Sequence, residues 1–214
     1  MQVAELELRA SVQVVRLGRT TYRVVRPTAP LAGWLVERLV CWSGVDGALD
    51  KHSLRALTIA WAFAARSPRT ITFLPISSDG PESTAHALDL VLVHHSLQLP
   101  ASRWRSVRRR LGPGHPETIT LPARAYDGHE EPDWSHRRAD RDRFTRTVAA
   151  GSLVLAGSRP AFERDLRQLV AMVEQGPAER AAFPNRHLCV ELADRWIHVE
   201  QVGRREAKLG AAAR

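Results

Sequence analysis

The chain has 214 residues, of which 44% are hydrophobic and 25% are charged, and this composition excludes a wholly disordered protein. Its formal net charge is +8, and of the 31 basic residues only Lys51 and Lys208 are lysine. Such an excess of positive charge attracts polyanions. Neither lysine follows a glycine, which excludes a phosphate-binding loop ending in Gly-Lys-Ser/Thr, and the scarcity of lysine disfavours Schiff-base enzymes.

Hydropathy and cysteine usage predict a cytoplasmic protein without a membrane partner. The most apolar run, residues 56–65, is about half of the roughly 20 residues that a spanning helix needs. The N-terminus has neither the basic start nor the apolar block of a secretion signal. Cys41 and Cys189 both stand beside large apolar residues, so we expect them to be small buried hydrophobic side chains outside any disulfide.

The first third of the chain predicts a hairpin and two helices. Apolar residues alternate with polar ones over 6–14, which is typical of a half-buried strand, and Gly18-Arg19 separates it from a returning strand over 21–26. The mostly apolar segment 31–42 predicts a short helix, followed by a turn at 43–47. Asp50 is positioned to cap a second helix, which ends near Arg66 and has enough apolar residues to pack on more than one side.

The middle of the chain alternates predicted strands and helices. Strands are expected over 70–76 and 87–94, and the second contains a continuous apolar run typical of a strand covered on both faces. Ser102 precedes a helix predicted over 103–111. A further strand is expected over 117–121.

The last third begins with a polar loop at 125–143 that leads into a short helix predicted near 139–149. A strand over 152–156 precedes a helix that begins at Pro160 and is expected to stop at Gly176-Pro177. The segments 188–192 and 196–202 predict a closing hairpin about Asp194.

These elements predict an α/β protein (mixed α+β) with one mixed β-sheet. The sheet would have Rossmann-like βα alternation in its middle, hairpins at its N- and C-terminal ends, and helices packed on it. Residues 1–203 would form a single domain, and residues 204–214 a flexible tail.

Two adjacent histidines follow the predicted strand 87–94. His94, His95 and Ser96 are candidate catalytic residues because open α/β sheets bind ligands at the carboxyl ends of their strands. A strand that ends in His-His resembles segments of dinuclear-metal proteins similar to GTP cyclohydrolases and of condensation-type acyltransferases. Leu99 stands where the acyltransferase motif has Asp, and the further ligands of the first group are missing, so neither family is assigned. The alternative is that both histidines hydrogen-bond to loop backbone.

The second candidate site is a cationic helix. Five arginines accompany an apolar face formed by Trp104, Val107 and Leu111, and no acidic residue lies between Asp89 and Glu117 to balance them. Guanidinium groups in this number suit phosphate groups, which arginine binds with two hydrogen bonds. These candidate anion-binding residues are Arg103, Arg105, Arg108, Arg109 and Arg110. The alternative is a solvated helix face in an arginine-rich chain.

No metal site and no cofactor are predicted. The nearest approach to a set of metal ligands is His129, His136 and Asp140 in the polar loop, where no strand holds them in place. The sequence also contains no intact catalytic motif, which favours a binding role over an enzymatic one.

Three functions therefore stay open. The first is an accessory protein that binds a polyanion such as nucleic acid through the arginine helix, alone or as a subunit of an assembly. The second is a small-molecule or metal-dependent enzyme built on His94 and His95. The third is a protein-interaction subunit that docks through strand edges or exposed tryptophans.

Overall fold

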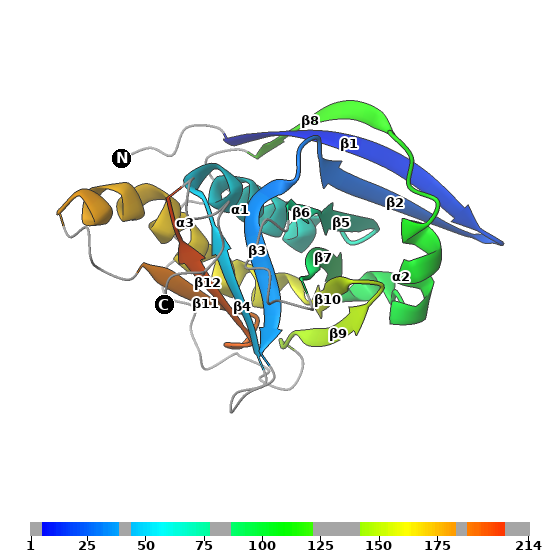
Figure 1. Ribbon diagram of the computed structural model, residues 1–214. Helices are drawn as coiled ribbons and strands as arrows, with labels where there is room; N and C mark the ends of the chain where they lie inside the picture. The colour runs from blue at the N-terminus through cyan, green and yellow to red at the C-terminus, as the bar shows by residue number, and fades with distance from the viewer. Residues whose placement is uncertain (1–5, 39–43, 78–86, 122–141, 183–187, 204–214) are drawn as a thin grey trace.

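The computed structural model describes residues 6–38, 44–77, 87–121, 142–182 and 188–203. Within these ranges the fold is mixed α+β, as predicted, with three α-helices and two mixed β-sheets (Figure 1). The expectation of one sheet is wrong. A seven-stranded sheet has the order β8-β1-β2-β5-β7-β10-β9, and a five-stranded sheet has the order β11-β12-β4-β3-β6. No helix in the described ranges is long and apolar enough to cross a membrane.

The seven-stranded sheet starts with the long strands β1 (Leu6–Leu17) and β2 (Thr20–Pro27), which pair antiparallel. Gly18 has φ +62° in the turn between them, a backbone conformation that glycine adopts without steric cost. β8 (His115–Leu121) pairs antiparallel with the other side of β1. β5 (Thr70–Leu74) lies parallel to β2.

The other half of this sheet contains β7 (Asp89–His94), which is antiparallel to β5 and parallel to β10 (Ser152–Gly157). At the edge, β9 (Thr145–Ala149) pairs with β10. The short helix predicted near 139–149 is therefore wrong over the residues described. Ala150 and Gly151 both have positive φ, as a two-residue hairpin turn requires, and this turn sets β9 against β10.

The five-stranded sheet contains the largest departure from the predicted elements. Residues 31–38 form strand β3 (Leu31–Arg38) instead of a helix, and β4 (Gly44–Leu49) replaces the predicted turn and pairs antiparallel with β3. Gly33 allows this pairing, because a Cβ there would lie 2.0 Å from the carbonyl oxygen of Ala48. The apolar content of this segment fits a buried helix or a buried strand equally well, and pairing with β4 decides between them.

Two C-terminal strands complete the five-stranded sheet. β12 (Ile197–Gln201) lies parallel to β4 and antiparallel to β11 (Cys189–Leu192). Val190 and Leu192 face the core, so the alternation of β11 places Cys189 on the exposed face, contrary to expectation. Cys41 lies outside the described residues. The short β6 (Ile76–Ser77) pairs with the other edge of β3, where the two sheets meet.

Helices α1 (Lys51–Arg66) and α3 (Arg159–Ala182) lie between the two sheets, and one core cluster joins their apolar side chains to both. Trp61 of α1 is fully buried, and its Nε1–H donates to the carbonyl oxygen of Phe162 at 3.1 Å. The burial of α1 on several sides agrees with its sequence. α3 continues past the predicted stop at Gly176-Pro177, and the absence of a Cβ at Gly176 leaves room for the Gln201 side chain.

The outer face of the seven-stranded sheet is covered by α2 (Ala101–Arg108). It begins two residues before the predicted start, after Pro100 instead of Ser102. A separate apolar cluster joins its Trp104 and Val107 to side chains of five strands. Among the described residues α2 is the one helix on this face, and its residues that point away from the sheet are exposed.

The N-cap of α1 gives a first testable prediction. Asp50 is buried, and its Oδ1 accepts a hydrogen bond from the Ser53 N–H at 2.8 Å. We expect Asp50→Ala to lower the free energy of unfolding by about 1 kcal/mol. The Ser53 N–H has no partner within the helix, and the substitution removes the side-chain oxygen that accepts its hydrogen bond. Urea denaturation measures this, with exposed Lys51→Ala as the control that leaves stability nearly unchanged. Equal stability of the two variants would contradict the capping role.

Candidate functional site

The predicted cationic helix is present in α2. Trp104 and Val107 are 0% exposed, and the Trp104 ring packs edge-on against Phe73 with their centroids 5.0 Å apart. Gln13 of β1 fixes the C-terminal end, since its Nε2 donates to the carbonyl oxygen of Arg110 and its Oε1 accepts from the Gly112 N–H. The helix is thus held rigidly on the sheet, with its arginines projecting from the remaining surface.

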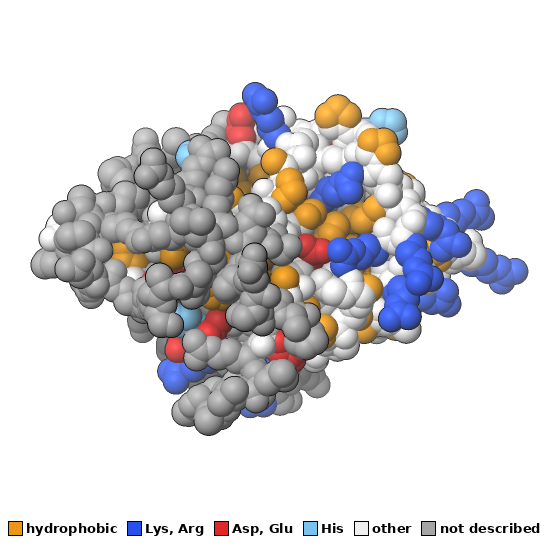
Figure 2. Space-filling model, viewed as in Figure 1, with side chains coloured by type: hydrophobic (Ala, Val, Ile, Leu, Met, Phe, Trp, Pro, Cys, Tyr) orange, Lys and Arg blue, Asp and Glu red, His pale blue; other side chains and the backbone are white. Residues whose placement is uncertain are grey.

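Four of the five predicted arginines are exposed. In the described ranges their side chains have neither a hydrogen bond nor an ion pair. Figure 2 shows Lys and Arg side chains gathered over α2 and at the neighbouring end of the β1–β2 hairpin. We call these four residues the basic face: Arg103, Arg105, Arg109 and Arg110.

Arg108 is different, because the expectation that no acidic residue balances it is wrong. Its Nη2 donates to Asp89 Oδ2 at 2.6 Å, and its Nη1 donates to Ser152 Oγ at 3.0 Å and also to the carbonyl oxygen of Ala150. The guanidinium also lies over the Phe73 ring, 5.5 Å from its centroid. Arg108 therefore ties α2 to β7 and to the β9–β10 turn, and cannot leave to pair with a phosphate without breaking these contacts.

The Asp89 carboxylate connects its own strand, β7, to α2 and to β6. Its Oδ2 accepts the hydrogen bond from the Arg108 guanidinium, and its Oδ1 accepts one from the backbone N–H of Ile76 in β6 at 2.9 Å. Burial raises the pKa of Asp89, and the Ile76 hydrogen bond and the Arg108 charge act in the opposite direction. Since 15% of the carboxylate side chain and 35% of the arginine side chain are exposed, the pair is partly open to solvent.

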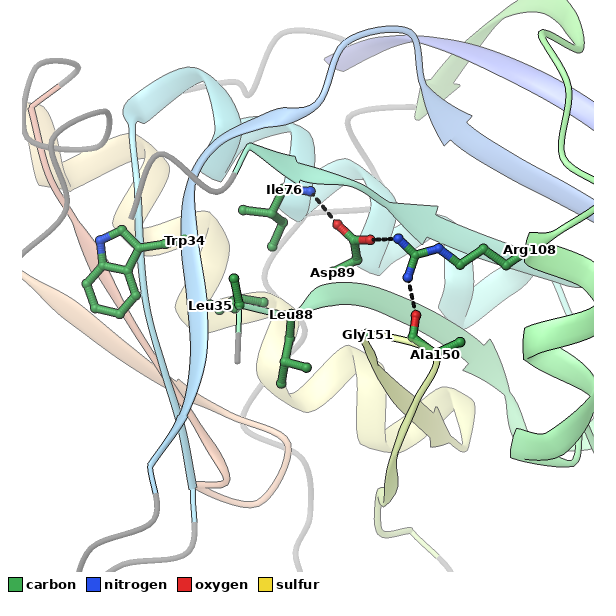
Figure 3. A pocket seen from close by; sticks show the side chains of 9 residues that line it. Trp34, Leu35, Ile76, Leu88, Asp89, Arg108, Ala150 and Gly151 are labelled. Atoms are coloured by element: carbon green, nitrogen blue, oxygen red, sulfur yellow. Dashed lines mark hydrogen bonds and ion pairs between the residues drawn. The ribbon is translucent and has the colours of Figure 1, made fainter. Parts of the chain in front are cut away.

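The exposed part of this pair lines a pocket of about 460 Å³ where the two sheets meet. Figure 3 shows Leu35, Ile76 and Leu88 on one side of the space and Asp89 with Arg108 on the other, while the Trp34 ring points away beyond β3. We call this the junction pocket. Its lining residues are Trp34, Leu35, Ile76, Ala87, Leu88, Asp89, Arg108, Ala150 and Gly151.

The two histidines lie at the end of β7, as predicted, but His94 has a local structural role. Its Nδ1 accepts the N–H of Ser96 at 3.3 Å and lies 2.7 Å from Ser96 Oγ, so the ring caps the short 3₁₀ turn η1 (His95–Leu97). Ser96 Oγ in turn donates to the carbonyl oxygen of Pro68 at 3.2 Å. Burial lowers the pKa of His94, and the neighbouring His95 lowers it further.

This arrangement gives little support to catalysis by His94, His95 and Ser96. The two rings contact each other with centroids 4.7 Å apart, but in the described ranges no carboxylate hydrogen-bonds to either ring to orient it as a base. These residues also do not line the junction pocket. Among the described residues no group of three His, Cys, Asp or Glu side chains could hold a metal ion. His129, His136 and Asp140 lie outside the described residues.

A second charged cluster lies between α3 and the turn of the C-terminal hairpin. Ala193, Asp194 and Arg195 have consecutive positive φ values of 52°, 58° and 70°. The nearly buried Asp165 holds this strained turn by accepting the Ala193 N–H at 2.6 Å. Arg164 pairs with both Asp165 and Asp194, at 3.0 and 2.8 Å. Sequence reasoning did not identify this cluster, because its members come from two distant elements.

The titration of Asp165 is testable. Burial raises its pKa from 3.8 to about 6, although Arg164 and the Ala193 hydrogen bond act against the shift. The folded state therefore binds this proton more strongly than the unfolded state, so the contribution of Asp165 to stability decreases as pH rises from about 4 to about 6. We expect a ¹³C-detected carboxyl titration to place its midpoint near pH 6. A midpoint near 3.8 would contradict this assignment.

Comparison with known proteins gives no relationship. No protein-family model, no curated protein and no solved structure matches this chain.

Proposed function

We propose that this protein binds a polyanion, a nucleic acid strand, and that the basic face of α2 is the contact surface. The observation that supports this proposal is the presence of four exposed guanidinium groups on α2 and the two residues that follow it, with no carboxylate partner in the described ranges. Arginine forms paired hydrogen bonds with phosphate oxygens, and its weak hydration makes this exchange favourable.

Rigidity of the support strengthens the proposal. Trp104 and Val107 are fully buried under α2, Gln13 holds its C-terminal end, and Arg108 is fixed by the Asp89 carboxylate. A surface whose backbone is already fixed loses less conformational entropy on binding than a flexible basic segment does. In this proposal Arg108 has a structural role, and the four arginines of the basic face contact the phosphates.

The ends of β1 and β2 extend the positive surface. Arg16 and Arg19 are exposed at the hairpin turn, and basic side chains continue from α2 to this end of the molecule in Figure 2. We propose that a nucleic acid strand bound across α2 runs toward this hairpin. We also propose that the protein binds it in the cytoplasm, as part of a larger assembly. Charge complementarity over such a length steers association and gives no base specificity by itself.

The proposal is tested by the salt dependence of binding. Fluorescence anisotropy of a labelled single-stranded dT 12-mer is measured with the full chain from low to physiological salt. We expect the logarithm of the association constant to fall linearly with the logarithm of salt concentration. Four phosphate contacts predict a slope of about −3, because each contact contributes about −0.7 on a single strand. A slope near zero, or no binding at low salt, contradicts the proposal.

A further inference from the structure

We infer that the junction pocket binds a single nucleobase, supplied by an unstacked nucleotide of the strand that the basic face holds. This inference rests on the proposed function and adds a base-binding subsite to it. The starting observation is a cavity of about 460 Å³ in which an ion pair faces an apolar wall, and Arg108 of α2 is one member of that pair. A cavity of this size lies within the range of small-molecule sites in proteins.

The ion pair keeps hydrogen-bonding capacity for a ligand. Three hydrogen bonds occupy the Arg108 Nη atoms, so two of the five guanidinium N–H donors are left over among the described residues. Asp89 accepts two hydrogen bonds, from Ile76 and Arg108, while a carboxylate has about four lone-pair positions. Asp89 and Arg108 both line the pocket, so a side chain that accepts hydrogen bonds lies beside one that donates them.

The charge and shape of the pocket identify the class of ligand. The carboxylate and the guanidinium neutralise each other, so the wall favours no net charge, and the opposite wall of Leu35, Ile76 and Leu88 favours an apolar surface. A flat neutral ring with a donor beside an acceptor on one edge satisfies both walls. Nucleobases have this pattern, as thymine does with its N3–H beside its O4.

The position of the pocket identifies the source of the base. Arg105 of α2 and the C-cap residue Arg109 are four residues apart, both are exposed, and Arg109 directly follows Arg108 in the chain. Their guanidinium groups stay free for phosphates while Arg108 turns inward to the pocket. A strand whose phosphates contact Arg105 and Arg109 thus has a base-sized cavity next to its backbone. A free nucleoside shares the same edge chemistry and is the alternative source.

The test compares two labelled 12-mers with the same charge, dT12 and a 12-mer composed entirely of abasic nucleotides, by anisotropy at constant salt. We expect the full chain to bind dT12 about tenfold more tightly, because only dT12 has a base to bury. Ile76→Trp, which fills the pocket, is expected to abolish the difference. Val148→Trp, on the exposed face of β9 and outside the pocket lining, is the matched control that keeps it.

A second arm needs no variant. Thymidine is titrated into the methyl-labelled wild-type protein, and the NMR signals of Leu35, Ile76 and Leu88 are followed. Equal affinity for the two 12-mers overturns the base pocket and leaves the proposed function standing. If neither 12-mer binds, the proposed function fails, and methyl shifts with thymidine then support the pocket as a site for a free nucleoside. Absence of thymidine shifts in that case overturns the pocket as well.

Discussion

Arg105→Glu/Arg109→Glu is expected to bind a single-stranded 12-mer roughly 100-fold more weakly than the wild type at low salt. Two charge-assisted contacts are lost, and two carboxylates are placed against the phosphates. Both side chains are exposed and have no partner in the described ranges, so the fold should tolerate the change. Anisotropy titration measures the affinity, and circular dichroism verifies that the protein stays folded.

The matched control is Arg9→Glu/Arg55→Glu. These arginines are also exposed and, in the part of the chain that the structure describes, also lack ion pairs, but they lie on β1 and α1. Each reversal lowers the net charge by two, so both double variants change it from +8 to +4. We expect the control to lose affinity by a few-fold only, through the general field. Equal losses in the two variants would show that net charge, not the basic face, determines binding.

The second large effect is expected at Arg108. Arg108→Met keeps much of the apolar stem but removes the guanidinium, which leaves the mostly buried Asp89 carboxylate with a single hydrogen bond, from Ile76. Loss of a charged hydrogen-bond partner at a partly exposed site costs about 2 kcal/mol. For a chain of this length the melting temperature should fall by roughly 4–8 °C.

Arg109→Met is the control for this prediction, because Arg109 is the C-cap residue that follows Arg108, and its side chain has no such contact among the described residues. Exposed substitutions of this type change stability by about 0.5 kcal/mol or less. Thermal melting of both variants tests the difference. For binding of the 12-mer we expect the opposite order, with Arg109→Met lowering the affinity more than Arg108→Met does. Similar melting temperatures for the two variants would refute the structural role of Arg108.

Local signals in the sequence were sufficient for several elements. The alternation over 6–14 indicates β1, Asp50 before an apolar helix identifies the start of α1, and Pro160 lies in the first turn of α3. These features are determined by neighbouring residues, through strand periodicity and helix capping. The segment 31–38 lacks such a signal. Its strand conformation depends on pairing with β4 and β6, and β6 lies about 40 residues away along the chain.

The candidate site was predictable only in part, for the same reason. The order of charges along the chain predicts the cationic helix. It indicates only that no acidic residue lies between Asp89 and Glu117, and not that Asp89 pairs with an arginine of this helix. The fold returns α2 across the sheet and brings Arg108 within 2.6 Å of that carboxylate. The junction pocket combines β3, β6, β7 and the β9–β10 turn. The one sign in the sequence that an arginine has a specific partner is the acidic residue Asp89 at the start of the buried strand β7.

The proposed function depends most on the basic face being the place where a polyanion binds. The most direct measurement is an amide NMR titration of the isotope-labelled full chain with the unlabelled dT 12-mer at low salt. We predict that the largest shifts cluster at residues 103–110 and at the turn of the β1–β2 hairpin, and that they disappear as salt is added. Shifts centred on another surface, or a spectrum unchanged by a large excess of the 12-mer, would contradict binding at the basic face.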